Sequence, residues 1–247
     1  MKPWQQLTND PNSIAVVLDR QANLSAVRNP TLVEDRVLYF CALAKGKRVL
    51  DVGVVDHCID AADSDNWLHG RLCRVASECH GVDVLPEQVA KLQQKGFSVS
   101  CINLVDGPIA QKFEVIICGE VLEHLDGTGR FLRNCRSMLP DEGLLVVSVP
   151  NPWYCNVFLK AAFGRHAYQD NVDHVAWYDA STIYELGQRC GFKLVKYSGV
   201  RVQGGKSLLA KLFFGLSRVW LTLGLRHEVL AKTMIYEFQA IPDAERS

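Results

Sequence analysis

Three residues near the middle of the first half of the chain have the types and spacing needed to hold a nucleoside. Asp51 and Gly53 follow the apolar run RVL, and Asp83 closes the run GVD. Because glycine has no β-carbon, a ligand can press against the backbone there. A carboxylate at the end of the next strand can accept hydrogen bonds from both hydroxyls of a ribose. These residues predict a nucleoside site, although Asp83 could instead cap the helix that begins at Pro86.

Two later positions fall at the ends of further apolar runs. Asn103 ends FSVSCIN, where its amide could read an adenine edge or form a turn. Gly119-Glu120 end FEVIICGE and lead into the segment V-L-E-H-L. If the runs are parallel strands, all of these ends meet at one edge of a sheet.

The apolar runs alternate with helical patterns along the chain. The expected strands are RVLDVG, HGVDV, FSVSCIN, FEVIICGE, GLLVVSVP, FKLVKYSG and TMIYEFQAI. The expected helices cover residues 31–44, 66–79, 86–96, 129–140 and 181–191. This alternation is typical of a doubly wound α/β domain, which binds its ligand where the strand order reverses.

The ordered runs RVLDVG, GVDVLPEQV, FEVIICGEVLEHL and LLVVSVPNP resemble the motifs of class I S-adenosylmethionine-dependent methyltransferases. The stretch E-V-L-E-H-L is the most specific of them, and the resemblance extends to DHVAWYDASTIYELGQRCGF. It implies a doubly wound, mostly parallel seven-stranded sheet of Rossmann-like type with helical lid insertions. It also implies S-adenosylmethionine as the cofactor and S-adenosylhomocysteine as its product.

The resemblance also implies roles for individual residues. Asp51 and Gly53 would shape the loop under the methionine part of the cofactor, and Asp83 would hold the ribose. Asn103 stands where an adenine-contacting aspartate is common in the family. Gly119-Glu120 would line the methionine side.

The first loop departs from the family pattern D-x-G-x-G-x-G. This chain reads D-V-G-V-V-D-H, so Val55 and His57 replace the second and third glycines, and their β-carbons disfavour positive φ. Three interpretations stay open: the loop follows another course and binds the cofactor with Asp56 or His57, it binds weakly, or it does not bind in a degenerate enzyme.

The segment DHCIDAADSDNWLHG, which extends this loop, is rich in aspartate. It lacks the glycine and the glutamate that an EF-hand loop requires. The sequence therefore predicts no metal site.

Methyl transfer depends mainly on placement, because the sulfonium already activates the methyl group. An oxygen acceptor of high pKa also needs a general base, for which histidine is suited near neutral pH. His124 and His174 are the catalytic candidates, with His57 as a third. Each of them could instead have a structural role.

The organisation predicted from the sequence is one methyltransferase domain over residues 1–247. Its core covers about 31–150 and 172–241, with lid insertions at about 151–171 and 203–230.

Residues 206–226 read as an apolar helix with a narrow polar stripe. Lys211 and Arg218 inside it argue against a spanning helix. The apolar face should pack on the domain or on a second copy, or contact a membrane or a lipid-linked acceptor.

The composition excludes several classes. The chain has 247 residues and 27 basic against 27 acidic side chains, and 48% of it is hydrophobic. That balance argues against general disorder and against a dedicated nucleic-acid binder. The start of the chain lacks the apolar region of a signal peptide, so we expect a cytoplasmic protein, with possible contact to the inner face of the membrane. Its nine cysteines form no C-x-x-C pair, which favours reduced cysteines packed as small hydrophobic residues.

Together these patterns predict methyl transfer from S-adenosylmethionine to a hydroxyl or similar group. The acceptor would be a small molecule, a sugar or glycan intermediate, or a lipid-like compound. A degenerate methyltransferase-fold subunit that acts as a binding or scaffold partner is the alternative. A nicotinamide-dependent oxidoreductase has less support, because no G-x-G-x-x-G follows the first strand.

Overall fold

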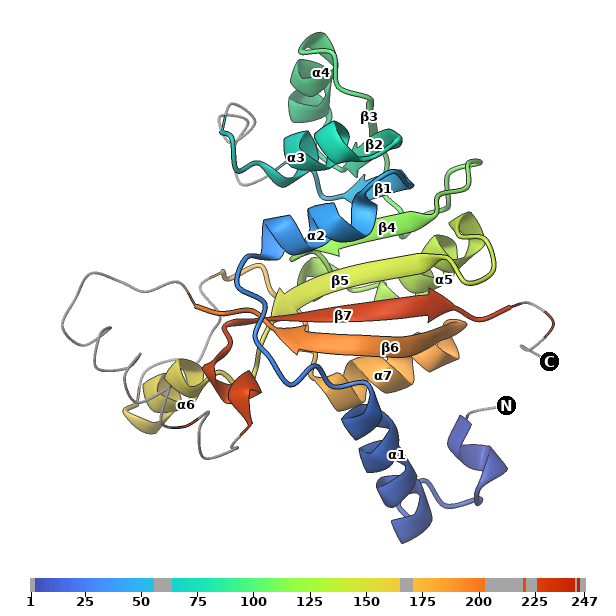
Figure 1. Ribbon diagram of the computed structural model, residues 1–247, viewed down its shortest axis with the longest axis vertical. Coiled ribbons are helices and arrows are strands. Elements are labelled where there is room, and N and C mark those ends of the chain that lie inside the picture. The colour runs from blue at the N-terminus through green and yellow to red at the C-terminus, as the bar shows by residue number, and fades with distance from the viewer. Residues whose placement is uncertain are drawn as a thin grey trace.

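The structure, a computed structural model, describes residues 3–55, 64–164, 171–202, 220, 226–242 and 244. Within these residues, seven strands form one sheet in the order β3-β2-β1-β4-β5-β7-β6 (Figure 1). The strands are β1 (Arg48–Val52), β2 (Glu78–Asp83), β3 (Val99–Cys101), β4 (Val115–Gly119), β5 (Leu144–Pro150), β6 (Phe192–Gly199) and β7 (Thr233–Ala240).

The sheet is mixed, with one strand running against the others. β1 pairs in parallel with β2 and β4, and the pairs β2–β3 and β4–β5 are also parallel. β7 lies between β5 and β6 and is antiparallel to both. The strand order reverses between β1 and β4, and doubly wound sheets bind their ligands beyond the carboxyl ends of the strands at such a reversal. The expected doubly wound, mostly parallel seven-stranded sheet is confirmed.

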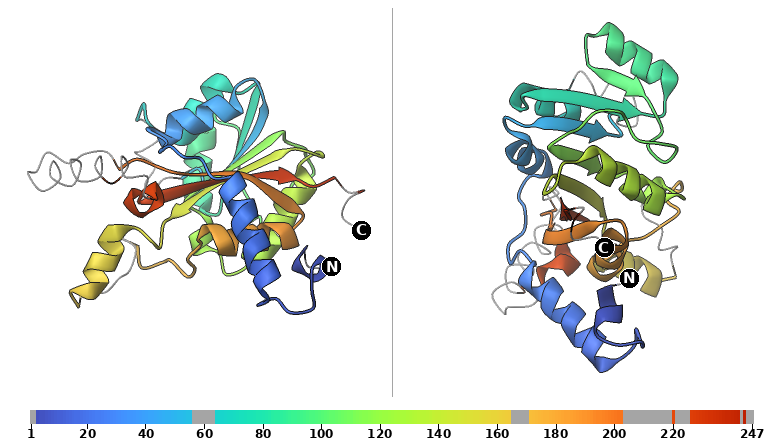
Figure 2. Two further views of the ribbon diagram at one scale, coloured as in Figure 1. Left: turned by 60° about the horizontal axis from the view of Figure 1, so that its bottom comes forward. Right: turned by 90° about the vertical axis from the view of Figure 1, so that its right-hand side faces the viewer.

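Helices cover both faces of the sheet (Figure 2). The helices are α1 (Ile14–Ala26), α2 (Arg36–Ala44), α3 (Leu68–Val75), α4 (Pro86–Gln94), α5 (Thr128–Met138), α6 (Cys155–Ala162) and α7 (Ala180–Arg189). Short 3-10 turns are η1 (Pro3–Gln6), η3 (Leu122–His124) and η4 (His227–Leu230). Helices α2 and α3 pack on one face, and α5 and α7 pack on the other.

The alternation of side chains along each strand builds two cores. On β5, Leu145 and Val147 join the core under α5 and α7, whereas Val146 joins the core under α2 and α3. Because both faces are covered, the central strands are largely apolar and do not alternate regularly between apolar and polar residues.

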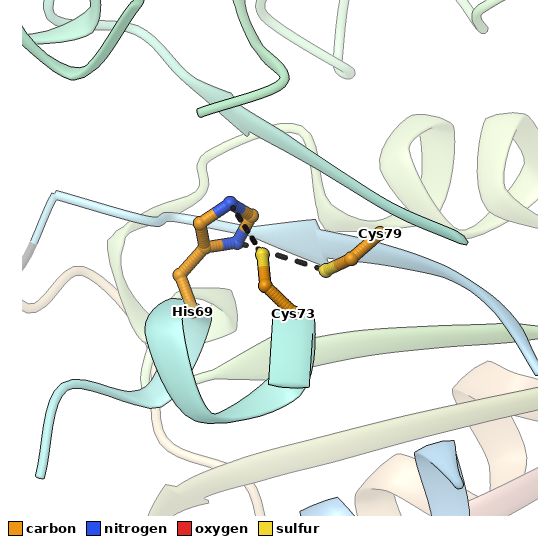
Figure 3. Close-up of side chains that lie close together, drawn as sticks. All are labelled: His69, Cys73 and Cys79. Carbon is orange, nitrogen blue, oxygen red and sulfur yellow. Dashed lines mark hydrogen bonds between the residues drawn. The ribbon is translucent and has the colours of Figure 1, made fainter. Parts of the chain in front are cut away.

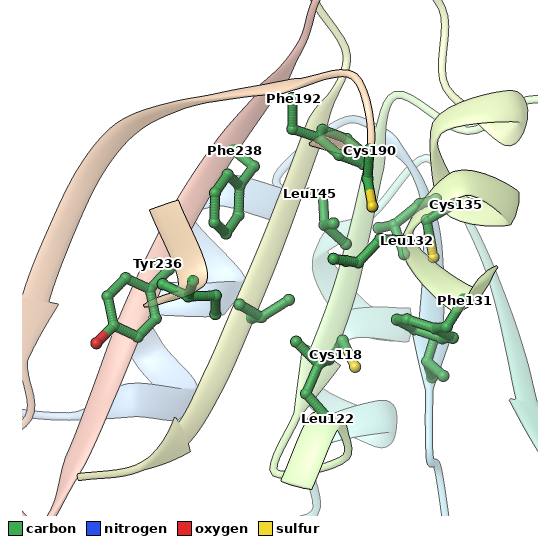
Figure 4. Packing of buried hydrophobic residues seen from close by; sticks show 14 of the residues in the cluster. Cys118, Leu122, Phe131, Leu132, Cys135, Leu145, Cys190, Phe192, Tyr236 and Phe238 are labelled. Carbon is green, nitrogen blue, oxygen red and sulfur yellow. The ribbon is translucent and has the colours of Figure 1, made fainter. Parts of the chain in front are cut away.

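Several cysteines lie in these cores as small hydrophobic residues. Cys118, Cys135 and Cys190 pack among aromatic and aliphatic side chains (Figure 4), and Cys41 is buried under the other face. None of the cysteines that the structure describes forms a disulfide. For these four, the predicted packing role is confirmed.

Two helix boundaries differ most from the sequence prediction. The helix expected over 31–44 begins at Arg36, because the Asp35 side chain accepts a hydrogen bond from the backbone N–H of Leu38 at 3.0 Å and caps it. The helix expected over 66–79 ends at Val75, and its last residues instead begin β2. Cys79 therefore lies on a strand.

Two helices of the structure are not among those predicted from the sequence. Helix α1 was not anticipated, and the Ser13 side chain caps its first turn. Helix α6 falls inside the predicted insertion at 151–171 and extends beyond the carboxyl ends of β5 and β6 (Figure 1). Apart from Trp220 and Arg226, the predicted helix over 206–226 lies outside the described residues, so its contact with a second copy or with lipid stays a prediction.

Within the described part of the chain, no helix combines the length and the apolar character needed to cross a membrane.

Candidate active site

The first strand ends in a glycine whose conformation and surroundings both require it. Gly53 has φ of 77°, and its N–H donates to the carbonyl of Val82 at 2.9 Å. A β-carbon on Gly53 would lie 2.6 Å from Cγ2 of Val121 in the loop after β4. The loops after β1 and β4 thus lie against each other at this edge of the sheet, and only glycine lets them come so close.

Asp83 closes the neighbouring strand and holds the backbone on both sides of it. Its Oδ2 accepts from the N–H of Val55 at 2.9 Å, and its Oδ1 accepts from Val84 at 2.7 Å and Leu85 at 3.2 Å. These bonds order the turn before α4. The N-cap of that helix is Leu85, so the alternative prediction that Asp83 caps the helix is wrong. A carboxylate offers about four acceptor positions, so Oδ2 retains capacity for a ligand hydroxyl.

Asp51, near the end of β1, forms a buried pair with a histidine. Its Oδ2 lies 3.0 Å from Nδ1 of His69 on α3, and the two residues are 2% and 0% exposed. Burial alone would lower the pKa of His69, but the hydrogen bonds to Asp51 and Cys73 raise it to about 9. The pair joins the end of β1 to α3.

Gly119 and Glu120 bring a carboxylate to the end of β4. Glu120 has φ of 57°, and its N–H donates to the carbonyl of Ser148 at 2.9 Å. Its Oε1 lies 3.3 Å from Nη1 of Arg36 and has no hydrogen-bond partner. Burial raises the pKa of this carboxyl, and the positive charge of Arg36 opposes that rise.

The other residues predicted to bind the cofactor are Asn103, Asp56 and His57. Asn103 is exposed, and its Oδ1 accepts from the N–H of Val105 at 3.0 Å. It therefore forms the turn that was one of its two interpretations. Asp56 and His57 lie outside the described residues.

The two catalytic candidates, 50 residues apart, meet at the same edge of the sheet. The rings of His124 and His174 are 4.7 Å apart and perpendicular in arrangement, with an interplanar angle of 80°. The N–H groups of Val175 and Ala176 donate to the carbonyl of Glu123 at 2.9 and 3.2 Å, which holds the segment of His174 against η3. His124 Nδ1 also lies 3.0 Å from Oδ2 of Asp173.

Glu123 completes this cluster, and it is not among the site residues predicted from the sequence. It is 2% exposed, and neither carboxylate oxygen has a hydrogen-bond partner. One carboxylate oxygen of Glu123 and one ring nitrogen each of His124 and His174 lie within 4.8 Å of one another. Burial, together with the negative charge of Glu120, raises the pKa of Glu123 to about 8, whereas burial lowers the pKa of His174.

Only its place in E-V-L-E-H-L marked Glu123 in the sequence. Its isolation from hydrogen-bond donors depends on the packing of the β4 loop against the segment of His174. The tertiary structure alone therefore reveals it as a candidate proton acceptor.

Comparison with known proteins agrees with the fold and the motifs. Residues 26–197 match the family described as methyltransferase domain. A ubiquinone biosynthesis O-methyltransferase of Coxiella burnetii is 29% identical over 163 residues, which is 63% of this chain and 68% of the relative. One from Bradyrhizobium diazoefficiens is 28% identical over 112 residues, and the chain spans only 41% of that relative's length.

Solved structures share the same fold at low identity. The N-methyltransferase NodS of Bradyrhizobium japonicum, in complex with S-adenosylhomocysteine, matches with a TM-score of 0.52 and 14% identity, over 97% of this chain and 92% of that one. A SAM-dependent methyltransferase of Archaeoglobus fulgidus matches with a TM-score of 0.55 and 15% identity, over 92% of this chain and all of the other.

The chain belongs to the methyltransferase domain family. It is an S-adenosylmethionine-dependent methyltransferase, and the family, the enzyme class and the cofactor predicted from the motifs are confirmed.

Proposed function

We propose that this enzyme methylates a hydroxyl oxygen of a small molecule with an apolar body, and that Glu123 accepts the hydroxyl proton. The observation that carries the proposal is the buried Glu123 carboxylate, whose two oxygens have no partner. The similarity to O-methyltransferases supports an oxygen acceptor.

The residues at the carboxyl ends of β1, β2 and β4 suit the cofactor. Asp83 has acceptor capacity for a ribose hydroxyl beside the close approach at Gly53. Oε1 of Glu120 has no hydrogen-bond partner, although Arg36 lies 3.3 Å away, and it suits the ammonium group of the methionine part. When bound, S-adenosylmethionine supplies a methyl group already activated by the sulfonium.

Proton transfer is the part of the reaction that the chain must supply. A general base works best when its pKa lies near the working pH. The raised pKa of Glu123, about 8, meets that requirement. His124 and His174 stand beside it, where they can position the acceptor or share the proton.

The apolar body of the acceptor is inferred from exposed aromatic side chains beyond the carboxyl edge. Trp153, Phe158 and Phe163 are 65%, 71% and 82% exposed on and around α6, and Trp177 follows the segment of His174. Large exposed apolar side chains on the segments beyond the carboxyl edge of the sheet favour an aromatic or lipid-like substrate.

The test is a panel of acceptors with S-adenosylmethionine, read by S-adenosylhomocysteine release and by the mass of the methylated product. The panel contains an alkyl-substituted catechol, a prenylated phenol, a lipid-linked sugar, a free sugar and an alkyl amine. We expect turnover with the phenolic hydroxyls. Turnover with the amine alone would contradict oxygen methylation, and turnover with the free sugar alone would contradict the apolar body.

The role of Glu123 is tested with Glu123→Gln, which keeps the shape but cannot accept a proton. We expect kcat to fall by more than about a hundredfold while the affinity for S-adenosylhomocysteine is kept. Glu87→Gln on the exposed face of α4 is the matched control. Unchanged kcat in Glu123→Gln would exclude Glu123 as the base.

A further inference from the structure

The structure gathers one histidine and two cysteines behind the first cofactor loop. His69 and Cys73 lie on α3 and Cys79 lies on β2, and Figure 3 shows the three side chains turned toward one another. We propose that His69, Cys73 and Cys79 bind a thiophilic transition-metal ion, for which Zn²⁺ is the reference.

The local structure explains why these three residues meet. His69 and Cys73 are four residues apart in a helix, so their side chains share one face. The chain leaves α3 at Val75 and enters β2 at Glu78, which returns Cys79 beside the same helix face. Cys79 pairs with Val49 of β1, so its position is set by the register of the sheet.

The distances suit a tetrahedral centre. Sγ of Cys73 lies 3.5 Å from Nε2 of His69, and Sγ of Cys79 lies 4.0 Å from Nδ1. One ligand atom from each of the three residues lies within 4.8 Å of the others. Zinc bonds of about 2.3 Å to sulfur and about 2.0 Å to nitrogen place neighbouring ligands about 3.5 Å apart. Sγ of Cys73 and Nε2 of His69 already have this separation, and the Cys79 thiol must move closer for one ion to join all three residues.

The Asp51 carboxylate provides the outer support that metal-binding histidines usually have. It bonds Nδ1 of His69 at 3.0 Å, which leaves Nε2 as the metal-facing nitrogen. Both side chains are buried, so the ring orientation is fixed. The ring of Trp67 lies 5.2 Å from His69 and that of Phe97 lies 5.9 Å away, which makes an apolar surrounding.

The ligand types determine which ion fits. Two sulfurs and one nitrogen favour Zn²⁺ or another thiophilic ion over Mg²⁺ or Ca²⁺, which prefer oxygen. Cys73 and Cys79 are half-buried, so the ion has a path from solvent. Three protein ligands leave the fourth position for water. A bound ion would fasten α3 to β2 directly behind Asp51 and so brace the start of the cofactor loop.

Co²⁺ is the spectroscopic probe for the test. The full chain is purified under reducing conditions, stripped of metal with a chelator and titrated with Co²⁺ alone. We expect a single equivalent to produce a near-ultraviolet thiolate-to-cobalt band and strong visible bands of a tetrahedral ion, and Zn²⁺ to displace it. The readout does not depend on methyl transfer, so it stands apart from the proposed function.

Variants separate this site from other cysteines. Cys73→Ser and Cys79→Ser should each weaken Co²⁺ binding by more than about tenfold, and Asp51→Asn should weaken it by about 10–100-fold while keeping the thiolate band. Cys101→Ser, at an exposed cysteine on β3, is the matched control and should bind as the unmodified chain does. Circular dichroism confirms that each variant is folded.

Two outcomes would overturn the proposal. One is the absence of a thiolate-to-cobalt band in the reduced, folded chain, or its persistence in the double variant Cys73→Ser/Cys79→Ser. The other is conversion of Cys73 and Cys79 to a disulfide, with a mass loss of two hydrogens, by a mild disulfide oxidant while saturating Zn²⁺ gives no protection.

Discussion

Nδ1 of His69 lies 3.0 Å from Oδ2 of Asp51, and this buried pair joins the end of β1 to α3. The sequence pattern associates Asp51 with the cofactor loop, but the structure also gives it a partner within the core. The same aspartate therefore has a structural partner in the core, and its role in the cofactor loop stays a prediction.

Asp51→Asn should destabilise the fold by about 3–5 kcal/mol, because it leaves a buried charged imidazole without its partner. Urea denaturation measures the change in the free energy of unfolding. Asp65→Asn is the matched control, since its pair with Arg74 is solvent-exposed and should contribute little. Equal stability of the two variants would contradict a charged pair in the core.

Gly53→Ala should also destabilise the fold, by about 3 kcal/mol. The positive φ alone costs about 1–2 kcal/mol, and the close contact with Val121 adds to it. Gly46 has a similar φ of 69°, and no atom lies within 4 Å of a β-carbon added there. Gly46→Ala therefore measures the free-energy cost of the positive φ alone. The double variant Gly53→Ala/Val121→Ala should recover part of the loss in chemical denaturation, and failure to recover would exclude the contact as a cause.

Asp83→Asn should lower the affinity for S-adenosylhomocysteine by at least about tenfold, because charge-assisted hydrogen bonds to the ribose would be lost. Isothermal titration calorimetry gives the affinity directly. Asp106→Asn, in the exposed turn after β3, serves as the control. An unchanged affinity would mean that the ribose lies elsewhere.

S-adenosylhomocysteine should raise the melting temperature of the chain. A ligand at a hundredfold excess over its Kd adds about 2.7 kcal/mol, which corresponds to about 5–11 °C for a domain of this size. Differential scanning fluorimetry measures the rise. No rise at millimolar ligand would favour a degenerate subunit, because Val55 and His57 replace glycines of the loop.

Stability should fall as the pH rises from about 4.5 to about 8, owing to Glu123. Burial raises the pKa of this carboxyl from 4.5 to about 8, so within that interval the folded state holds a proton that the unfolded state has lost. Each pKa unit is worth about 1.36 kcal/mol, which gives a loss on the order of 2–5 kcal/mol.

Glu123→Gln should remove most of this slope, leaving the part above about pH 6.5 that the raised pKa of His69 contributes. The variant should be the more stable form at the alkaline end, because its amide carries no charge to bury. Urea denaturation across the interval, with Glu87→Gln as the control, measures it. A slope that is identical in the Glu123 variant would show that other groups cause it.

Much of the fold could be predicted from local sequence. The apolar runs and their alternation with helices correspond to the strands of the sheet, because burial on both faces leaves a continuous apolar signal. Boundaries were less predictable: the helix expected to reach residue 79 stops at Val75, since pairing with β1 draws the next residues into β2. Because the prediction placed Cys79 in a helix, it did not indicate that Cys79 lies close to His69.

The candidate site divides in the same way. Asp51, Gly53, Asp83 and Gly119-Glu120 are local to strand ends, so the sequence by itself determined which residues stand at the carboxyl edge and to which family the chain belongs. Their assigned roles stay predictions. What only the tertiary structure decided are the partners across long separations: His69 with Asp51, His124 with His174, and the isolation of Glu123. The physical reason is that burial, charge and ligand distance depend on which elements pack together, and no spacing along the chain records that.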